Sequence, residues 1–138
     1  MTERTYGKKY NPELKVKDIA KLVKKEIKEK YKNIKVSART RNYSSIDINV
    51  ELPKEQYKAV DEDDLTKGAI YYDVEMRARR EGKTIPEFLK DRNILNKEAK
   101  AIEKDIDAML LAYNYDGSDI MTDYFDKNFY GFVNIELV

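Results

Sequence analysis

The spacing of apolar residues changes along this chain, and each spacing predicts one structural element. The first regular window runs from Val16 to Lys32, where apolar residues recur every three or four positions and lysines fill most places between them. Such spacing is typical of a helix with one buried stripe. Asn33 suits the left-handed residue that often ends a helix. We therefore predict an amphipathic helix with a basic outer face.

A second pattern, strict alternation of apolar and polar residues, follows the helix. It runs from Ile34 to Arg39 and again from Ser45 to Leu52, as expected of two half-buried strands. The polar segment Thr40–Ser44 separates them, and Pro53 would end the second strand. The pattern predicts a β-hairpin.

Residues 53–95 carry weaker helical patterns. The acidic run Asp61–Asp64 can open a helix that continues to about Arg80, because carboxylates stabilise helix N-termini. Thr84 is a suitable N-cap for a short helix after it. We interpret this region as a helical insertion.

The remaining sequence predicts one more helix and one more strand. Asn96 can cap a helix whose apolar residues step regularly to Tyr113, and Gly117 is a natural stop. The segment Phe129–Val138 is rich in strand-forming residues. The order predicts an α+β fold: a two-layer domain whose three-stranded sheet, hairpin plus C-terminal strand, is covered by two helices. The direction of the third strand is left open.

The 138 residues suffice for one domain. We expect a flexible N-terminal arm over 1–15 and a single domain over 16–138, with the insertion at about 53–95. Apolar stretches are only a few residues long, and the N-terminus has no apolar signal region. We therefore expect a cytoplasmic protein with no membrane contact.

Missing residue types restrict the chemistry. The chain has no cysteine and no histidine, which excludes disulfides, thiol nucleophiles, Ser-His-Asp triads and imidazole or thiolate metal sites. A catalyst would need carboxylates, Lys, Arg or Tyr, with a hard cation such as Mg²⁺. We expect no enzymatic activity, no cofactor and no bound metal, and keep a Mg²⁺-dependent enzyme built on the C-terminal aspartates as an alternative.

The net charge of +1 hides a gradient, from +8 over residues 1–40 to −1 over 41–100 and −6 over 101–138. Such asymmetry is typical of a nucleic-acid face or of self-complementary halves. A solvated helix surface, partly neutralised by Glu26 and Glu29, explains the lysines equally well. The residues that could contact phosphates lie on the first helix and the hairpin: Lys21, Lys24, Lys28, Arg39 and Arg41.

The opposite end of the chain concentrates aromatic and acidic residues. Seven of its 11 tyrosines and 4 phenylalanines fall between Tyr113 and Phe132. Aromatic side chains offer large contact areas at low entropic cost, so this run is our preferred binding site. Its residues are Tyr115, Asp116, Asp119, Asp123, Tyr124 and Asp126. The spacing of the acids fits no common calcium loop, and caps or turns are the alternative interpretation.

Alternation along the last predicted strand assigns its aromatic residues to two different faces. It sends Phe129, Gly131, Val133 and Ile135 to one face, and Tyr130, Phe132 and Asn134 to the other. With one face packed on helices, the other set is either covered by the insertion or exposed as a contact surface.

Two segments together resemble a known family. From Asp18 to Val50 the chain has a basic amphipathic helix, a strand with a Ser-x-Arg step at Ser37 and Arg39, a Tyr-Ser turn at Tyr43, and a second strand. This order resembles the start of the large polyvalent protein-associated domain of type twenty-nine. The run Asp116, Ser118, Asp119, Met121, Asp123 and Tyr124 is similar to the family's later aromatic and acidic signature.

The resemblance covers about half the chain. The family's Gly-rich hairpin turn is shortened here to RNYSS, and residues 53–95 are additional. Domains of this kind occur in polyvalent proteins of phages and conjugative elements, among effectors that help incoming DNA establish itself. The family has no established chemistry, so the resemblance supplies a biological setting only.

These observations lead to a first hypothesis and an alternative. The first is a small, non-enzymatic interaction protein of a phage or mobile genetic element. It would act in counter-defence or host takeover by binding a host protein or protein–nucleic-acid complex, for example by inhibiting a restriction enzyme or, as an anti-CRISPR protein, a CRISPR effector. The alternative is a nucleic-acid-binding accessory protein that uses the basic helix and hairpin.

Overall fold

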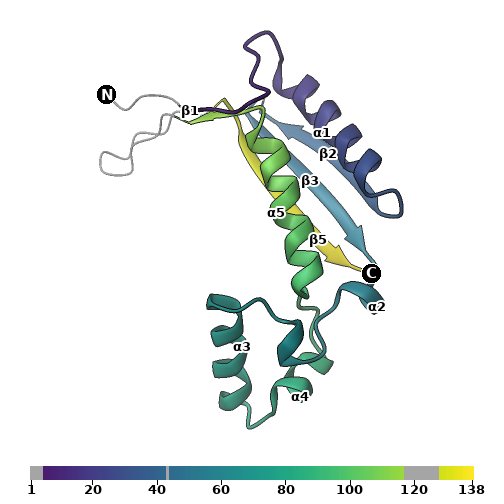
Figure 1. The fold of residues 1–138 in the computed structure, drawn as a ribbon, viewed down its shortest axis with the longest axis vertical. Helices are drawn as coiled ribbons and strands as arrows, with labels where there is room; N and C mark the ends of the chain where they lie inside the picture. The colour runs from purple at the N-terminus through teal and green to yellow at the C-terminus, as the bar shows by residue number, and fades with distance from the viewer. Residues whose placement is uncertain (1–4, 43, 117–127) are drawn as a thin grey trace. The chain divides into compact units, whose positions relative to one another are not determined.

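The computed structural model describes residues 5–42, 44–116 and 128–138 and has the predicted α+β architecture (Figure 1). Its longer elements lie close to the predicted windows. In chain order the elements are β1 (Thr5–Tyr6), α1 (Val16–Lys30), β2 (Lys35–Arg41), β3 (Ser45–Leu52), α2 (Lys54–Tyr57), the 3₁₀ turn η1 (Glu62–Asp64), α3 (Ala69–Arg80), α4 (Ile85–Lys90), α5 (Lys97–Leu111), β4 (Tyr115–Asp116) and β5 (Tyr130–Leu137).

The central sheet has the strand order β2-β3-β5, so the hairpin and the C-terminal strand share one sheet as predicted. The structure also settles the direction of β5. The Tyr130 N–H donates to the Ser44 carbonyl over 2.7 Å, and the Val138 N–H donates to the Leu52 carbonyl over 2.9 Å. The difference in residue number between donor and acceptor is the same in both bonds. Strand β5 therefore runs parallel to β3, as the arrows in Figure 1 show.

Within the described residues of unit 1, the helices cover one face of the sheet only. Along β3 the residues alternate between fully buried, such as Ile46 and Ile48, and partly exposed, such as Asp47 and Asn49. Helix α1 packs against β2, and α5 lies on the same side of the sheet (Figure 1). The two-layer prediction is confirmed, and half of each strand's side chains are left on an uncovered face.

Polar contacts join the two covering helices. Lys30 at the end of α1 forms an ion pair with Asp105 of α5 at 2.6 Å, and the Tyr31 hydroxyl donates to the same carboxylate. Partial burial opposes ionisation of Asp105, but the hydrogen bonds from Lys30 and Tyr31 and the charge of Lys30 outweigh it, so the pKa of this carboxyl is lowered. The ionised form therefore helps hold the helices together.

The chain folds into two compact units. Unit 1 comprises Met1–Val50 and Lys104–Ile135, and unit 2 comprises Glu51–Glu103 and Glu136–Val138. The whole predicted insertion falls in unit 2. The sequence predicts a single domain over residues 16–138, a range that includes unit 2. Unit 2 has its own small core, formed by Ala59, Leu65, Val74, Ala78, Phe88 and Leu89.

Local signals explain most of unit 2. Thr84 caps α4 by accepting from the Glu87 N–H, and Asn96 caps α5 by accepting from the Ala99 N–H, both as predicted. The single helix predicted from Asp61 to about Arg80 is wrong. Gly68 has a φ of +115°, so the acidic turn η1 ends before it and α3 begins after it.

The N-terminal region contains a pairing that sequence periodicity did not indicate. Strand β1 pairs antiparallel with β4, with Tyr6 opposite Tyr115. Beyond it, the Gly7 and Lys9 N–H groups donate to the carbonyls of Asn114 and Ala112, between α5 and β4, over 2.8 and 2.7 Å. A Cβ at Gly7 would lie 2.2 Å from the Leu111 carbonyl oxygen, so only glycine allows this approach.

Candidate functional site

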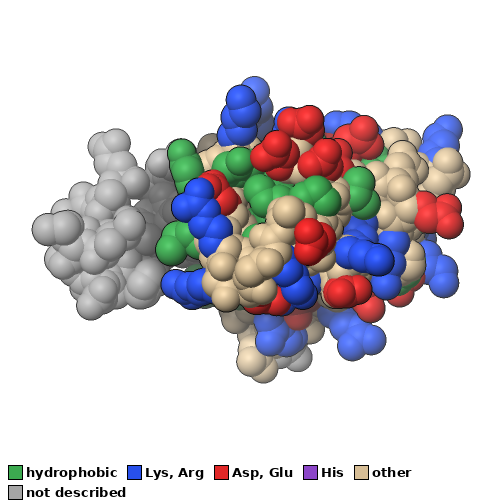
Figure 2. Space-filling model, turned by 90° about the horizontal axis from the view of Figure 1, so that it is seen from below, with side chains coloured by type: hydrophobic (Ala, Val, Ile, Leu, Met, Phe, Trp, Pro, Cys, Tyr) green, Lys and Arg blue, Asp and Glu red, His purple; other side chains and the backbone are tan. Residues whose placement is uncertain are grey.

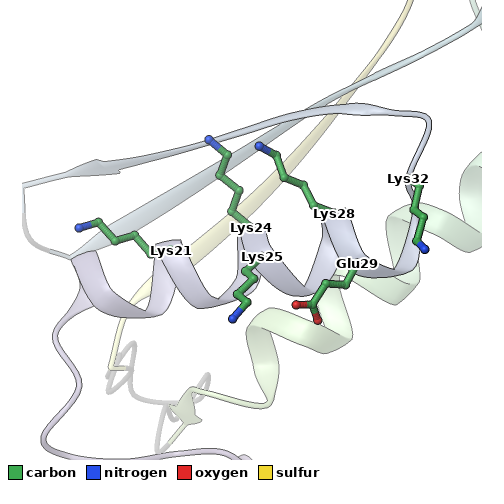
Figure 3. A pocket seen from close by; sticks show the side chains of 6 residues that line it. All are labelled: Lys21, Lys24, Lys25, Lys28, Glu29 and Lys32. Atoms are coloured by element: carbon green, nitrogen blue, oxygen red, sulfur yellow. The ribbon is translucent and has the colours of Figure 1, made fainter.

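The first candidate surface is a basic flank of α1. Figure 3 shows Lys21, Lys24 and Lys28 pointing to one side of the helix, the three lysines that the sequence singles out. With Lys25 and Lys32 they line a shallow hollow of about 590 Å³ that also includes Glu29. The hollow is open to solvent and charged, unlike the enclosed apolar pockets that bind small molecules. It fits an extended anionic partner.

The helix separates its charges. Lys21, Lys24 and Lys28 lie on the flank toward β2, and Lys25 points to the other side (Figure 3). Glu26 lies away from the three lysines, where its carboxylate accepts from Lys9 at 2.5 Å and from the Tyr113 hydroxyl at 2.6 Å. Burial, followed by the hydrogen bond to Glu26 and its negative charge, raises the pKa of Tyr113 to about 12. Glu26 is therefore turned away from the basic flank, whereas Glu29, the other acid that could neutralise it, lines the hollow with the lysines.

The two candidate arginines lie on a different surface. Val36 and Ala38 of β2 turn toward the helices, so Arg39 and Arg41 point to the uncovered face of the sheet. Arg41 forms an ion pair with Asp47 at 2.8 Å, with a second hydrogen bond at 3.1 Å. The five candidate phosphate contacts thus occupy two surfaces that meet at the edge strand β2.

The uncovered face also carries aromatic and amide side chains. Phe132 is 45% exposed and Tyr130 is 39% exposed. The Arg41 guanidinium lies 5.7 Å from the centre of the Phe132 ring, which places both on this face. Asn134 donates to Asn49 over 3.2 Å on the neighbouring strand. The alternation predicted for β5 is confirmed, and Phe132 and Tyr130 belong to its exposed half.

The preferred aromatic and acidic site is described only in part. Tyr115 lies in β4, and its ring packs with Tyr6 and Tyr10 at centroid distances of 5.9 and 5.5 Å. Tyr6 remains 54% exposed. Asp116 is described by its backbone, opposite Thr5. The remaining predicted residues, Asp119, Asp123, Tyr124 and Asp126, lie outside the described residues.

Asn114 has a role that the sequence did not reveal. It is 8% exposed, and its side-chain oxygen accepts from the N–H groups of Tyr115, Asn128 and Phe129 at 2.9–3.3 Å. Its amide nitrogen donates to the Phe129 carbonyl over 2.8 Å. Asn114 therefore joins the start of β4 to the start of β5.

Elsewhere the charges are mixed. Figure 2 shows acidic and basic side chains interspersed around a strip of apolar ones. On α3, Arg79 pairs with Glu75 at 2.7 Å, and Arg77 lies 3.5 Å from Asp73. Both are spaced one helical turn apart, so the basic end of α3 is largely compensated. Unit 2 also has a hollow of about 270 Å³ with mixed lining: Glu62, Asp63, Leu65, Lys67, Gly68, Tyr71, Tyr72 and Lys97.

Within the described ranges, no three acidic residues come close enough to hold a metal ion. No helix of that part of the chain is long and apolar enough to cross a membrane. Comparisons with protein-family models, curated proteins and solved structures find no match to this chain.

Proposed function

We propose that this chain is a non-enzymatic binding protein whose basic flank on α1 contacts the phosphate backbone of a nucleic acid, either alone or within a protein–nucleic-acid complex. The observation that carries the proposal is the side-by-side placement of Lys21, Lys24 and Lys28, extended by Lys25 and Lys32 around one hollow.

These lysines are available for a partner. The ion pairs of the described chain involve none of the five, although Lys9 before them and Lys30 among them are paired. Successive lysines on one helix flank lie one turn apart, about 5.4 Å along the axis. A row of unpaired cations at this spacing can replace the condensed counterions of a polyanion, whose release drives binding.

The biological setting we propose is a host cell entered by a phage or mobile element. Its support is the resemblance of Asp18–Val50 to polyvalent protein-associated domains, and these residues form α1, β2 and most of β3. The basic flank therefore belongs to the part of the chain that carries the resemblance. A protein that occupies nucleic acid, or the complex that reads it, would interfere with a host defence.

The direct test is charge reversal of Lys21, Lys24 and Lys28 to Glu, with binding to DNA and RNA measured across salt concentrations. The matched control reverses Lys54, Lys90 and Lys104, which are also exposed and change the net charge equally. We expect the first variant to lose binding at moderate salt. Its salt slope should fall by about 2 to 3, since each phosphate contact contributes about 0.7–0.9.

The control should bind as wild type does, and circular dichroism should show both variants folded. Equal losses of binding in the two variants would mean that the net charge alone causes the effect. That result would contradict a specific role of the basic flank. Failure of wild type to bind single- or double-stranded DNA or RNA at low salt would remove the proposal altogether.

A second candidate function is protein binding by the aromatic and acidic run, as in a counter-defence inhibitor. The observation that favours it is the ring cluster of Tyr6, Tyr10 and Tyr115, in which Tyr6 is exposed and the other two are half-buried. Tyrosines at a contact surface supply area, and nearby carboxylates would meet a partner surface rich in Arg or Lys.

This candidate is tested with Asp119→Lys and Tyr124→Ala. We expect both to weaken capture of a nucleic-acid-binding host enzyme while leaving the melting temperature close to wild type. Equal capture by wild type and both variants would remove the run as a binding site, and a large drop in melting temperature would assign it a structural role.

A further inference from the structure

We propose that the uncovered face of the sheet is a stacking platform for single-stranded nucleic acid, with Phe132 and Tyr130 as the surfaces on which bases stack. This inference rests on the function proposed for the basic flank and names its ligand class.

The exposure of Phe132 is the first observation. Its neighbours along β5, Val133 and Ile135, turn toward the helices, so the covered face does not need Phe132 for its core. An exposed aromatic ring keeps apolar surface in water, and such rings are concentrated at contact surfaces. Tyr130 lies two residues earlier on the same face and is also exposed. The face therefore presents two rings in a row.

Their spacing distinguishes an extended strand from a duplex. Residues two apart in a strand are about 6.6 Å apart. Bases within one strand of a duplex follow each other at about 3.4 Å. Rings on Tyr130 and Phe132 thus match bases of an extended strand, because a stacked duplex leaves no room for a ring between successive bases. Stacking of this kind accepts any base, since each base has a π face.

Cations line one edge of the same face. The uncovered face carries Lys35, Arg39 and Arg41 on β2, whereas its carboxylates, Asp47, Glu51 and Glu136, lie on β3 and β5. The cations all lie on β2, the edge strand against which α1 packs. Phosphates crossing this edge would pass from the arginines to the lysines of α1. The hydrogen-bonded amides of Asn49 and Asn134 add polar groups for base edges.

The contact of Arg41 with Phe132 does not block the platform. The guanidinium lies 5.7 Å from the ring centre, and Arg41 is 60% exposed. A cation–π contact at an exposed site is weak compared with stacking of a base. Asp47 also holds the guanidinium in place, so its own planar face is available for a base.

The test compares two substitutions of Phe132 on an oligonucleotide of mixed sequence and on an abasic strand of equal length. Phe132→Leu keeps an apolar side chain but removes the π face, and Phe132→Trp keeps it. We expect Phe132→Leu to weaken binding of the natural strand by about 5- to 150-fold, the range of one lost stack. Phe132→Trp should bind at least as tightly as wild type.

The abasic strand makes the result specific. It keeps the phosphates and lacks bases, so wild type and Phe132→Leu should bind it equally. Tyr72→Leu is the matched control, because Tyr72 is 64% exposed on α3 in unit 2. It should leave binding of both strands unchanged. A duplex should show no dependence on Phe132.

A second measurement uses the absence of tryptophan from the chain. In Phe132→Trp the new indole is the single tryptophan, and stacking on a base should quench its emission on addition of the natural strand. The abasic strand should leave the emission unchanged, as should the natural strand with Tyr72→Trp.

The outcomes separate this inference from the function on which it rests. If reversal of the three lysines weakens binding but Phe132→Leu does not, the platform is overturned and the basic flank stands; the aromatic face would then belong to a protein partner. If Phe132→Leu weakens the natural and abasic strands equally, base stacking is overturned. Absence of any binding by wild type overturns both.

Discussion

The two faces of the sheet differ in their side chains, although the same strands form both. On the covered face, Ile46, Ile48 and Val50 are completely or almost completely buried under the helices. On the uncovered face, the alternate residues are charged, polar or aromatic and remain in contact with water. The two sets of side chains alternate along the same strands. Packing on the covered face therefore also fixes the backbone that carries the side chains of the uncovered face.

The difference separates stability from binding. Burial of apolar area stabilises the fold at about 25 cal/mol per Å², and that area lies on the covered face. Substitutions on the uncovered face therefore should change binding with small effects on folding. The basic flank of α1 follows the same division, because Ile19, Val23 and Ile27 carry its packing and the lysines do not.

The largest expected effect is on the covered face. Ile48→Ala should lower the free energy of unfolding by about 2–5 kcal/mol, because a fully buried side chain leaves a cavity. Its neighbour Asn49 points to the uncovered face, and Asn49→Ala should cost less than about 1 kcal/mol. Chemical denaturation of both variants measures the difference, and similar losses would show that the two faces are not distinct.

A polar residue sharpens the comparison. Asn114→Ala removes a buried side chain that satisfies several backbone groups, and each group left without a partner costs about 1–3 kcal/mol. Asn134→Ala is the matched control, since this exposed side chain donates a hydrogen bond to another side chain, that of Asn49. We expect clear destabilisation from the first and less than about 0.5 kcal/mol from the second. Thermal melts that rank them in reverse would contradict the assigned role of Asn114.

A pH experiment probes the helical layer. The folded state raises the pKa of Tyr113 to about 12 from its ordinary 10, so it holds this proton more tightly than the unfolded chain. The resulting stabilisation is complete below pH 10 and is lost as the pH rises toward 12. Tyr113→Phe should lack this loss. Melting temperatures of both proteins between pH 9 and 12 give the comparison; parallel curves would mean that Tyr113 does not contribute.

The smallest expected effect is on the uncovered face. Asp47→Asn should change the free energy of unfolding by less than about 1 kcal/mol, because its ion pair with Arg41 is partly exposed. The same change removes a negative charge from the proposed platform, so affinity for single-stranded nucleic acid should rise slightly. A fall in affinity would show that the orientation of Arg41 matters more than the charge of the face.

The sequence predicted those parts of the fold that depend on neighbouring residues. Alternation from Ile46 to Leu52 gave the buried half of β3, and Thr84 and Asn96 cap the helices for which they were proposed. The predicted left-handed residue at Asn33 is wrong. Among described residues other than glycine, only Asn42 in the hairpin turn has a positive φ. Asparagine tolerates this conformation at both positions, so composition alone could not choose.

Features set by distant residues could not be predicted. Alternation along β5 gives its two faces but not its direction, which depends on bonds to β3. The pair β1–β4 contains too few residues to show a period. Helical spacing places Lys21, Lys24 and Lys28 on one face and turns Glu26 away from them, but the contacts of Glu26 with Lys9 and Tyr113 could not be predicted.

The parallel pairing of β5 with β3 also has a consequence for the order of folding. Strands β2 and β3 meet across a short turn, but β5 reaches β3 only after the whole stretch from Leu52 to Tyr130. The entropy lost in closing a loop grows with its length, so the hairpin can form early and β5 joins late. During synthesis, one edge of the apolar strand β3 stays unpaired until residues 130–137 have emerged. A nascent chain in this state would be prone to aggregation through that edge, and a chaperone that shields it would raise the yield of folded protein.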